Sequence, residues 1–362
     1  MMMKPIADDR NLKLGLTGLL RVKNDGEFLE RCILSCIEAL DELIIVWNDC
    51  SDNSAQEIDR LSKLYPDKIK AFEYPYKIYA LGLSHEEFQY ADSLPEDSPN
   101  LLCNYYNYCL SKVSYQYAIK IDADQIYNTE KLKSYQDLIK SNIKQEWKSI
   151  DIIGALVHLC MKINKRGGIF FNHTLSFFNF TLPPSIRLCY IHFINLAFLK
   201  YSWSLSFSGI NVFYYKNEGY VPLGGISERI NILPPYNGTG DHLLFKVTKD
   251  CYYKKYISPM YNKLKSNDYS IIETFVCPQK EVLAGFLWYH ISMERESIRN
   301  VIENEVKNKP SIFLRFDTFI KLKYKDVLTI IDTRMFAPAT QTLFQNVYMV
   351  FKDELNNIIK HN

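Results

Sequence analysis

The chain has 362 residues, of which 47% are hydrophobic, and its formal net charge at pH 7 is +2. A chain of this length and composition can bury the core of one large α/β domain with additions, or of two coupled domains. The near-neutral charge disfavours general nucleic-acid binding, which usually needs a concentrated basic face. The nine cysteines form no C-x-x-C pair, which disfavours a zinc knuckle or a disulfide framework and favours a reducing cytoplasm.

The first third of the chain alternates between strand and helix patterns. Strands are predicted at residues 14–22, 43–47 and 69–74 and in the run that ends at Asp122. Helices are predicted at residues 27–40, 55–65 and 101–113. Residues 76–100 are predicted to be irregular. This order predicts a doubly wound, mainly parallel sheet flanked by helices, with its ligand site at the carboxyl ends of the strands. No glycine-rich dinucleotide or P-loop motif occurs in the first half, which disfavours oxidoreductases and P-loop phosphotransferases.

Two carboxylates, Asp122 and Asp124, follow the fourth predicted strand. They are one residue apart, so both can project from the strand end toward one cation, which prefers oxygen ligands. The alternative for so short a pattern is a solvated connection between a strand and a turn.

Three other patterns precede this Asp-x-Asp pair. Residues 19–25 read LLRVKND, residues 47–54 read WNDCSDNS, and Asn107 of a Tyr-Asn pair stands 15 positions before Asp122. In this order the patterns resemble the GT-A glycosyltransferases, especially the inverting family 2 group. That group usually has Asp-Asp-Gly-Ser-x-Asp in the second loop, whereas here Asn48 replaces the first Asp and a cysteine replaces the Gly.

The resemblance implies an α/β fold of the GT-A type and a set of site residues. It implies that the nucleotide-sugar is bound by Arg21, Asn24, Asp49, Asn107 and Asp122. Asp49 matches the residue that helps to hold the uracil or ribose. A divalent cation, Mn²⁺ or Mg²⁺, held by Asp124 and by Asp122, which touches the ribose or the metal through water, would act as a Lewis acid on the leaving diphosphate.

Beyond the Asp-x-Asp pair the pattern changes. A helix is predicted at residues 131–147, an apolar strand at residues 152–163 and a turn at residues 165–168. Residues 170–215 are dense in aromatic side chains. The resemblance implies that this segment forms the acceptor side, where an aromatic surface suits a glycan or lipid-linked glycan. The alternative is an ordinary aromatic core with loops.

Asp241 follows a loop rich in Gly and Pro, and a helix is predicted to begin at Leu243. A carboxylate at this place can be a helix cap. Inverting members of the resembled family place an Asp or Glu base here, which takes the proton from the acceptor hydroxyl. The resemblance therefore makes Asp241 the candidate catalytic base.

His290 ends an apolar, strand-like run at residues 286–289. It can be an ordinary buried or surface histidine. GT-A enzymes often supply a further metal ligand from a late strand, so the resemblance makes His290 a candidate ligand, with His242 as its rival.

The remainder of the chain predicts a C-terminal helical extension. Helices are predicted at residues 296–306 and 313–324 and along the apolar positions from residue 343 to residue 359. A basic stretch at residues 307–325 is either a solvated face or a weak contact with an anionic membrane surface. The expected division is a nucleotide-sugar-binding half at 1–125, an acceptor-binding and catalytic half at 126–292 and the extension at 293–362.

Together these features predict a metal-dependent inverting glycosyltransferase of the hexosyltransferase type. It would move a sugar from a nucleotide-sugar, expected to be a UDP-sugar, to a glycan or lipid-linked glycan in bacterial surface-polysaccharide biosynthesis. The expected location is the cytoplasm, at the inner face of the membrane. Two alternatives remain open: an aspartate-dependent phosphohydrolase and a non-catalytic protein that binds nucleotides or glycans. The donor sugar, the acceptor, the metal and the oligomeric state are left open.

Overall fold

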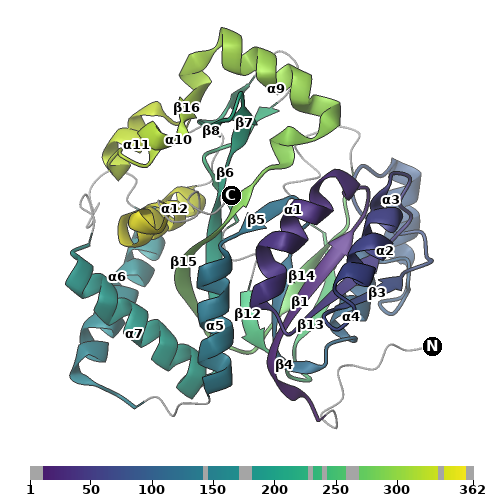
Figure 1. The fold of residues 1–362 in the computed structure, drawn as a ribbon, viewed down its shortest axis with the longest axis horizontal. Helices are drawn as coiled ribbons and strands as arrows, with labels where there is room; N and C mark the ends of the chain where they lie inside the picture. Colours follow the sequence, from purple (N-terminus) through teal and green to yellow (C-terminus); the bar gives the residue numbers. More distant parts are fainter. Residues whose placement is uncertain are drawn as a thin grey trace. The chain divides into compact units, whose positions relative to one another are not determined.

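The structure is a computed structural model that describes residues 11–141, 146–170, 182–226, 231–238, 243–257, 269–332 and 338–355. The chain folds into two compact units (Figure 1). The first contains Met1–Ala123 and Phe245–Gln279, and the second contains Asp124–Leu244 and Lys280–Asn362. The chain thus returns to the first unit for residues 245–279, which the division predicted from the sequence places in the acceptor-binding half.

The first unit is built on four parallel strands in the order β3-β2-β1-β4. They are β1 (Lys13–Val22), β2 (Glu42–Trp47), β3 (Ile69–Glu73) and β4 (Tyr115–Ile121). The two central strands, β1 and β2, contain nearly continuous apolar runs whose side chains are fully buried, as expected for a parallel sheet covered on both faces. The predicted α/β class with a mainly parallel sheet is confirmed.

The helices of the first unit follow the strands as the sequence predicts, with one addition. They are α1 (Gly26–Cys36), α2 (Ser54–Leu64), α3 (His85–Ser93) and α4 (Leu102–Leu110). Helix α3 lies in the segment predicted to be irregular, and a capping box of Ser84 and Glu87 starts it. Residues 245–279 add the antiparallel strands β13 (Tyr252–Tyr256) and β14 (Ile272–Val276), against which α4 packs.

The second unit has a mixed sheet. Strand β6 (Ser204–Asn211) runs parallel to β15 (Glu281–His290), which pairs antiparallel with β5 (Gln125–Tyr127). On its other side β6 pairs antiparallel with the start of β12 (Leu243–Lys246) and with β11 (Tyr236–Asn237). Two smaller antiparallel sheets join β7 (Phe213–Tyr215), β8 (Glu218–Pro222) and β16 (Phe313–Arg315), and β9 (Gly225–Ile226) with β10 (Asn231–Ile232).

Most helices of the second unit lie in its middle segment and its C-terminal extension. They are α5 (Thr129–Ser141), α6 (Ser149–Phe170), α7 (Pro184–Tyr201), α9 (Glu296–Asn308), α10 (Phe316–Phe319), α11 (Tyr324–Ile330) and α12 (Pro338–Phe351). Helices α6 and α7 lie side by side, and α12 packs on α6 (Figure 1). Among the described helices, none combines the length and the apolar character needed to cross a membrane. The predicted C-terminal helical extension is confirmed.

The strand predicted at residues 152–163 and the turn predicted at residues 165–168 are wrong, because both segments belong to helix α6. Val157 and Met161 of this segment are buried, whereas Ile153, Leu156 and Leu159 are exposed. Apolar side chains therefore lie on both the inner and the outer side of the helix. This distribution hides the helical period, so the run resembles a buried strand.

The helix predicted from Leu243 is also wrong. Leu244 is buried and pairs with Leu205 of β6, so sheet pairing decides the conformation here. The helix predicted at residues 313–324 is wrong at its start, where Phe313–Arg315 forms β16 against β8.

Candidate functional site

Along the chain, the boundary between the two units falls within the Asp-x-Asp segment. Asp122 directly follows β4, whereas Asp124 directly precedes β5 and begins the second unit. Each carboxylate has its own set of neighbours within its own unit.

In the first unit, two cations flank the Asp122 carboxylate. Arg21 Nη2 lies 3.4 Å from Asp122 Oδ1, and Lys120 Nζ lies 3.4 Å from Asp122 Oδ2. The parallel register that sets Leu20 opposite Ile121 brings Arg21 to this place from 101 positions earlier in the chain. The carboxylate is thereby paired with two cations at the carboxyl end of the sheet.

Arg21 is the most enclosed member of this cluster, with a side chain that is 5% exposed. Its guanidinium lies 4.1 Å from the centre of the Tyr106 ring, a cation–π contact. Its Nε–H is buried without a hydrogen-bond partner among the described residues. Glu273 of β14 lies close by. Burial raises the pKa of Glu273, while Lys120 and Arg21 act to lower it.

The loops after β1 and β2 are joined to one another. Asn24 Oδ1 accepts a hydrogen bond of 2.7 Å from the backbone N–H of Ser51. Asn24 and Asp49 both have left-handed backbones, with φ of 57° and 46°. The Asp49 side chain is 77% exposed, and its Oδ2 lies 3.6 Å from Lys23 Nζ. Asp49 is therefore accessible to a ligand.

Asn48, which departs from the family pattern, has a structural reason to be an amide. Its buried Nδ2 donates to the carbonyl oxygens of Tyr74 and Tyr76 at 2.6 and 2.8 Å. An aspartate carboxylate could not make these bonds, because it has no donor.

Asn107 is engaged by the protein itself. Its Nδ2 donates to the carbonyl oxygen of Tyr253 at 2.8 Å, and its Oδ1 accepts from the backbone N–H of Tyr253 at 2.7 Å. The side chain thus ties α4 to β13 within the first unit. Its predicted contact with a nucleotide-sugar stays a prediction.

In the second unit, His290 stands between Asp124 and Asn211. His290 Nε2 lies 3.2 Å from Asp124 Oδ2, and His290 Nδ1 lies 2.5 Å from Asn211 Oδ1. The parallel pairing of β15 with β6 places His290 opposite Asn211. The backbone N–H of Ile291 donates to the carbonyl oxygen of Asp124, which aligns Asp124 with the end of β15.

The orientation of Asn211 determines which imidazole nitrogen carries the proton. Asn211 Nδ2 faces the carbonyl oxygens of Pro234 and Tyr236 at 2.7 and 2.9 Å, so it must donate to them. Asn211 Oδ1 is then an acceptor, and His290 Nδ1 must be the donor toward it. In a neutral imidazole, Nε2 consequently presents its lone pair to the Asp124 carboxylate. Two acceptors that face each other need a proton or a cation between them.

Among the described residues, no group of three or more His, Cys, Asp and Glu side chains is gathered as a ready metal site. Asp124 and His290 form a pair of donor atoms, and the third predicted ligand, Asp122, belongs to the other unit. The metal assignments remain predictions. Asp241 and His242 lie outside the described residues, so their assignments stay predictions as well.

Sequence reasoning missed Lys120, Asn211 and Glu273. Lys120 could have been predicted from the sequence, because it stands two positions before Asp122 and its side chain therefore lies on the same face of the strand. Asn211 and Glu273 could not, since pairing of distant strands brings them to their places.

Comparison with known proteins adds one family match. Residues 7–174 match the family model described as "Beta-1,4-N-acetylgalactosaminyltransferase (CgtA)". No curated protein matches the chain.

Several solved structures are similar to parts of the chain. A structure of S. aureus TarS 1-349 is 11% identical over 94% of this chain and 91% of that chain, with a TM-score of 0.31. TarS 1-349 in complex with UDP is 15% identical over 35% of this chain, with a TM-score of 0.24. Glucosyl-3-phosphoglycerate synthase from Mycobacterium tuberculosis, in complex with Mn²⁺, UDP and phosphoglyceric acid, is 16% identical over 32% of this chain, with a TM-score of 0.20. The chain spans 32% and 34% of the lengths of these last two structures.

Proposed function

We propose that this protein, whose residues 7–174 match a glycosyltransferase family model, is a metal-dependent inverting enzyme of the GT-A type. It transfers a hexose-type sugar from a UDP-sugar to a glycan or lipid-linked glycan in bacterial polysaccharide synthesis, in the cytoplasm and in peripheral contact with the membrane. The name of the matched family makes UDP-N-acetylgalactosamine the first donor to test. The observation that carries the proposal is the pairing of Asp124 with His290.

A divalent cation fits this pair. Neighbouring ligand atoms of a cation bound at about 2.1 Å stand roughly 3 Å apart, and His290 Nε2 stands 3.2 Å from Asp124 Oδ2. Asn211 supports binding because it keeps the proton on Nδ1 and leaves Nε2 free to be a ligand. Mn²⁺ or Mg²⁺ held here supplies Lewis-acid stabilisation for the charge that develops on the leaving diphosphate.

The donor side of the proposed site consists of Arg21, Asn24, Asp49, Asn107 and Asp122. Arg21 and the lysine two positions before Asp122 each lie 3.4 Å from the Asp122 carboxylate, whose proposed role is to contact the ribose or a metal-bound water. Asn24 and Asp49 lie in the loops at the carboxyl ends of β1 and β2, where a parallel sheet binds nucleotides.

Asp241 is the proposed base that removes the proton from the acceptor hydroxyl as it attacks the anomeric carbon. Attack from the face opposite the leaving diphosphate inverts the configuration at that carbon. An Asp241→Asn enzyme is expected to bind UDP normally and to lose transfer. Normal transfer by this variant would contradict the assignment.

Thermal unfolding with UDP and UDP-N-acetylgalactosamine, with and without MnCl₂, tests the proposal. A ligand that binds only the folded state at about 100 times its Kd raises stability by about 2.7 kcal/mol. We expect UDP compounds to raise the Tm of the unchanged protein by an amount that depends on Mn²⁺. In Asp124→Asn the Mn²⁺-dependent part of this rise should vanish, and sugar transfer should be lost. No shift with any nucleotide would overturn the proposal. Hydrolysis of p-nitrophenyl phosphate without a nucleotide would instead favour a phosphohydrolase.

A further inference from the structure

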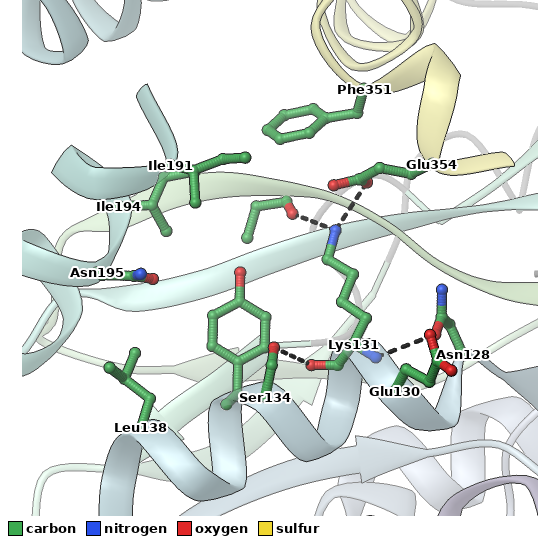
Figure 2. A pocket seen from close by; sticks show the side chains of 12 residues that line it. Asn128, Glu130, Lys131, Ser134, Leu138, Ile191, Ile194, Asn195, Phe351 and Glu354 are labelled. Carbon is green, nitrogen blue, oxygen red and sulfur yellow. Dashed lines mark hydrogen bonds and ion pairs between the residues drawn. The ribbon is translucent and has the colours of Figure 1, made fainter. Parts of the chain in front are cut away.

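The second unit contains a cavity of about 390 Å³ that is distinct from the Asp124–His290 pair. Its walls come from α5, α7 and β15 and from the end of the described chain, Phe351 and Glu354 (Figure 2). Ligand pockets usually span roughly 300–1,000 Å³, so this one has room for a single small ring rather than a nucleotide.

A fixed ion pair lies at one end of the cavity. Lys131 Nζ lies 2.8 Å from Glu354 Oε2 and donates to the carbonyl oxygen of Ala284 at 2.6 Å. The same Oε2 accepts from the backbone N–H of Phe286 at 3.1 Å. The two charged side chains are only 13% and 21% exposed, and Figure 2 shows Lys131 reaching from α5 toward Glu354. The pair brings charged groups to the cavity without a net charge.

Several polar groups on the cavity wall have hydrogen-bonding capacity that the described residues do not use. Glu354 Oε1, the Asn195 amide and the Tyr135 hydroxyl make no hydrogen bond to any described residue. Asn195 and Glu354 are only partly buried, so these groups can make hydrogen bonds to a molecule in the cavity. Between them they can both accept and donate, which suits a polar occupant with donors and acceptors of its own.

Besides Asn128, Ser134 and the exposed Glu130, the wall has an apolar part. Leu138 of α5, Ile191 and Ile194 of α7 and Phe351 of α12 line it. An anion would face the carboxylates of Glu354 and Glu130, and a cation would face the ammonium of Lys131, so neither is favoured. A neutral ring with hydroxyl groups on its edge and C–H groups on its faces matches both kinds of wall. A sugar ring has this chemistry.

The cavity is remote from the proposed reaction centre. The lining residue that follows β5 is Asn128, four residues after Asp124. The lining residue on β15 is Ala284, six residues before His290. At about 3.3 Å per strand residue, these separations are on the order of 13 to 20 Å. A sugar in the cavity cannot be the one that is being transferred.

We propose that this cavity is a separate binding site for one neutral sugar unit. In a glycosyltransferase it would hold a unit of the acceptor glycan away from the bond being formed, and this role rests on the proposed function. Binding of a free glycoside to the cavity does not rest on the proposed function. The cavity proposal and the proposed function can therefore fail independently.

Ligand-observed NMR on the full chain, without UDP or metal, tests the site. The probes are methyl β-galactopyranoside and its N-acetylgalactosamine analogue, with glucuronate and glucosamine as charged comparisons. We expect saturation transfer to a neutral glycoside and none to the charged sugars. Tyr135→Phe and Asn195→Leu should each weaken binding by about fivefold, the effect of one lost hydrogen bond.

Tyr201→Phe, at the exposed end of α7, is the matched control and should bind as the unchanged protein does. Thermal unfolding with UDP and Mn²⁺ shows whether each variant is folded with an intact donor site. Failure of both neutral glycosides to bind would overturn the proposal. So would unchanged binding by folded Tyr135→Phe and Asn195→Leu, or displacement of the glycoside by UDP-N-acetylgalactosamine. Lack of transfer activity in a chain that binds the glycoside would overturn only the proposed function.

Discussion

At the scale of single residues, Asn211 controls the chemistry of His290. Its amide uses both hydrogens on the carbonyl oxygens of Pro234 and Tyr236, which leaves its oxygen to accept from His290 Nδ1. Contact with a carboxylate alone does not decide which imidazole nitrogen carries the proton. In His290 the hydrogen bond from Nδ1 to Asn211 decides it, so the tautomer is defined. Asn211 is therefore a positioning residue in the proposed site.

The change Asn211→Ala should weaken Mn²⁺ binding by about 10- to 100-fold, because such supporting partners orient a ligand and raise its basicity. Titration of free Mn²⁺ by electron paramagnetic resonance measures the affinity without reference to activity. Asn195→Ala is the matched control, since that amide makes no hydrogen bond to a described residue. Equal Mn²⁺ affinity in Asn211→Ala and the unchanged protein would remove Asn211 from the site.

His158 gives the fold a pH dependence. Burial among the rings of Phe193 and Trp203, with Lys162 nearby, lowers the pKa of His158 from 6.5 to about 4. Between these pH values the unfolded chain binds a proton that the folded chain does not, so stability falls as the pH decreases from 6.5 toward 4. We expect His158→Leu to reduce the difference in Tm between pH 7 and pH 5.

The exposed His85 provides the control for this prediction. Thermal unfolding of His85→Leu at the same two pH values should show the dependence of the unchanged protein. An undiminished difference in Tm for His158→Leu would show that other groups dominate the acid response.

At the scale of elements, the short helix after α12 is tied to α5 by one buried ion pair. Removing one partner leaves the other charge buried and uncompensated, which typically costs about 3–5 kcal/mol. We expect Glu354→Gln to lower the free energy of unfolding by this order, measured by urea denaturation. Asp353→Asn is the neighbouring control. Asp353 is 54% exposed in its pair with Arg187, so the loss there should be below about 1 kcal/mol.

Helices α6 and α7 meet at Gly154. A Cβ built there would lie 2.5 Å from the carbonyl oxygen of Cys189 and would also clash with Phe193. Replacing glycine by alanine inside a helix usually stabilises it by about 1 kcal/mol. Here we expect Gly154→Ala to destabilise the protein by about 1–3 kcal/mol, because the backbone of α7 cannot move aside easily. A rise in urea midpoint would show that the two helices can separate at no cost.

At the scale of the whole molecule, the first unit is discontinuous in the chain. Strands β13 and β14 come from residues 245–279, and Asn107 of α4 is bonded on both ends of its amide to Tyr253. Residues 1–123 alone would expose the face of α4 that these strands cover. The first unit therefore needs both segments.

Two shortened chains test this requirement. Residues 1–123 alone should fail to unfold cooperatively, whereas residues 1–123 joined to residues 245–279 by a flexible Gly/Ser linker should do so. Circular dichroism during urea denaturation measures both. Equal cooperativity of the two chains would show that β13 and β14 are dispensable for the first unit.

Local patterns in the sequence predict the parallel half of the fold. The apolar runs of β1, β2 and β4 and the amphipathic faces of α1 and α2 have clear periods, and their order implies a shared ligand edge. Arg21 and Asp122 could be assigned to that edge because Arg21 is the second-last residue of β1 and Asp122 directly follows β4. The family match over residues 7–174 covers this same part of the chain.

The second half was predicted less well because its conformation depends on partners far away in the sequence. Helix α6 has apolar side chains on two sides, and β12 is a strand only because β6 lies beside it. The Asp-x-Asp pattern is visible in the sequence by itself, and so is the resemblance that gives it a role. Only the tertiary structure decided that His290 faces Asp124 across 166 positions and that Lys131 meets Glu354 across 223, because strand register and helix packing, not local preference, bring such side chains together.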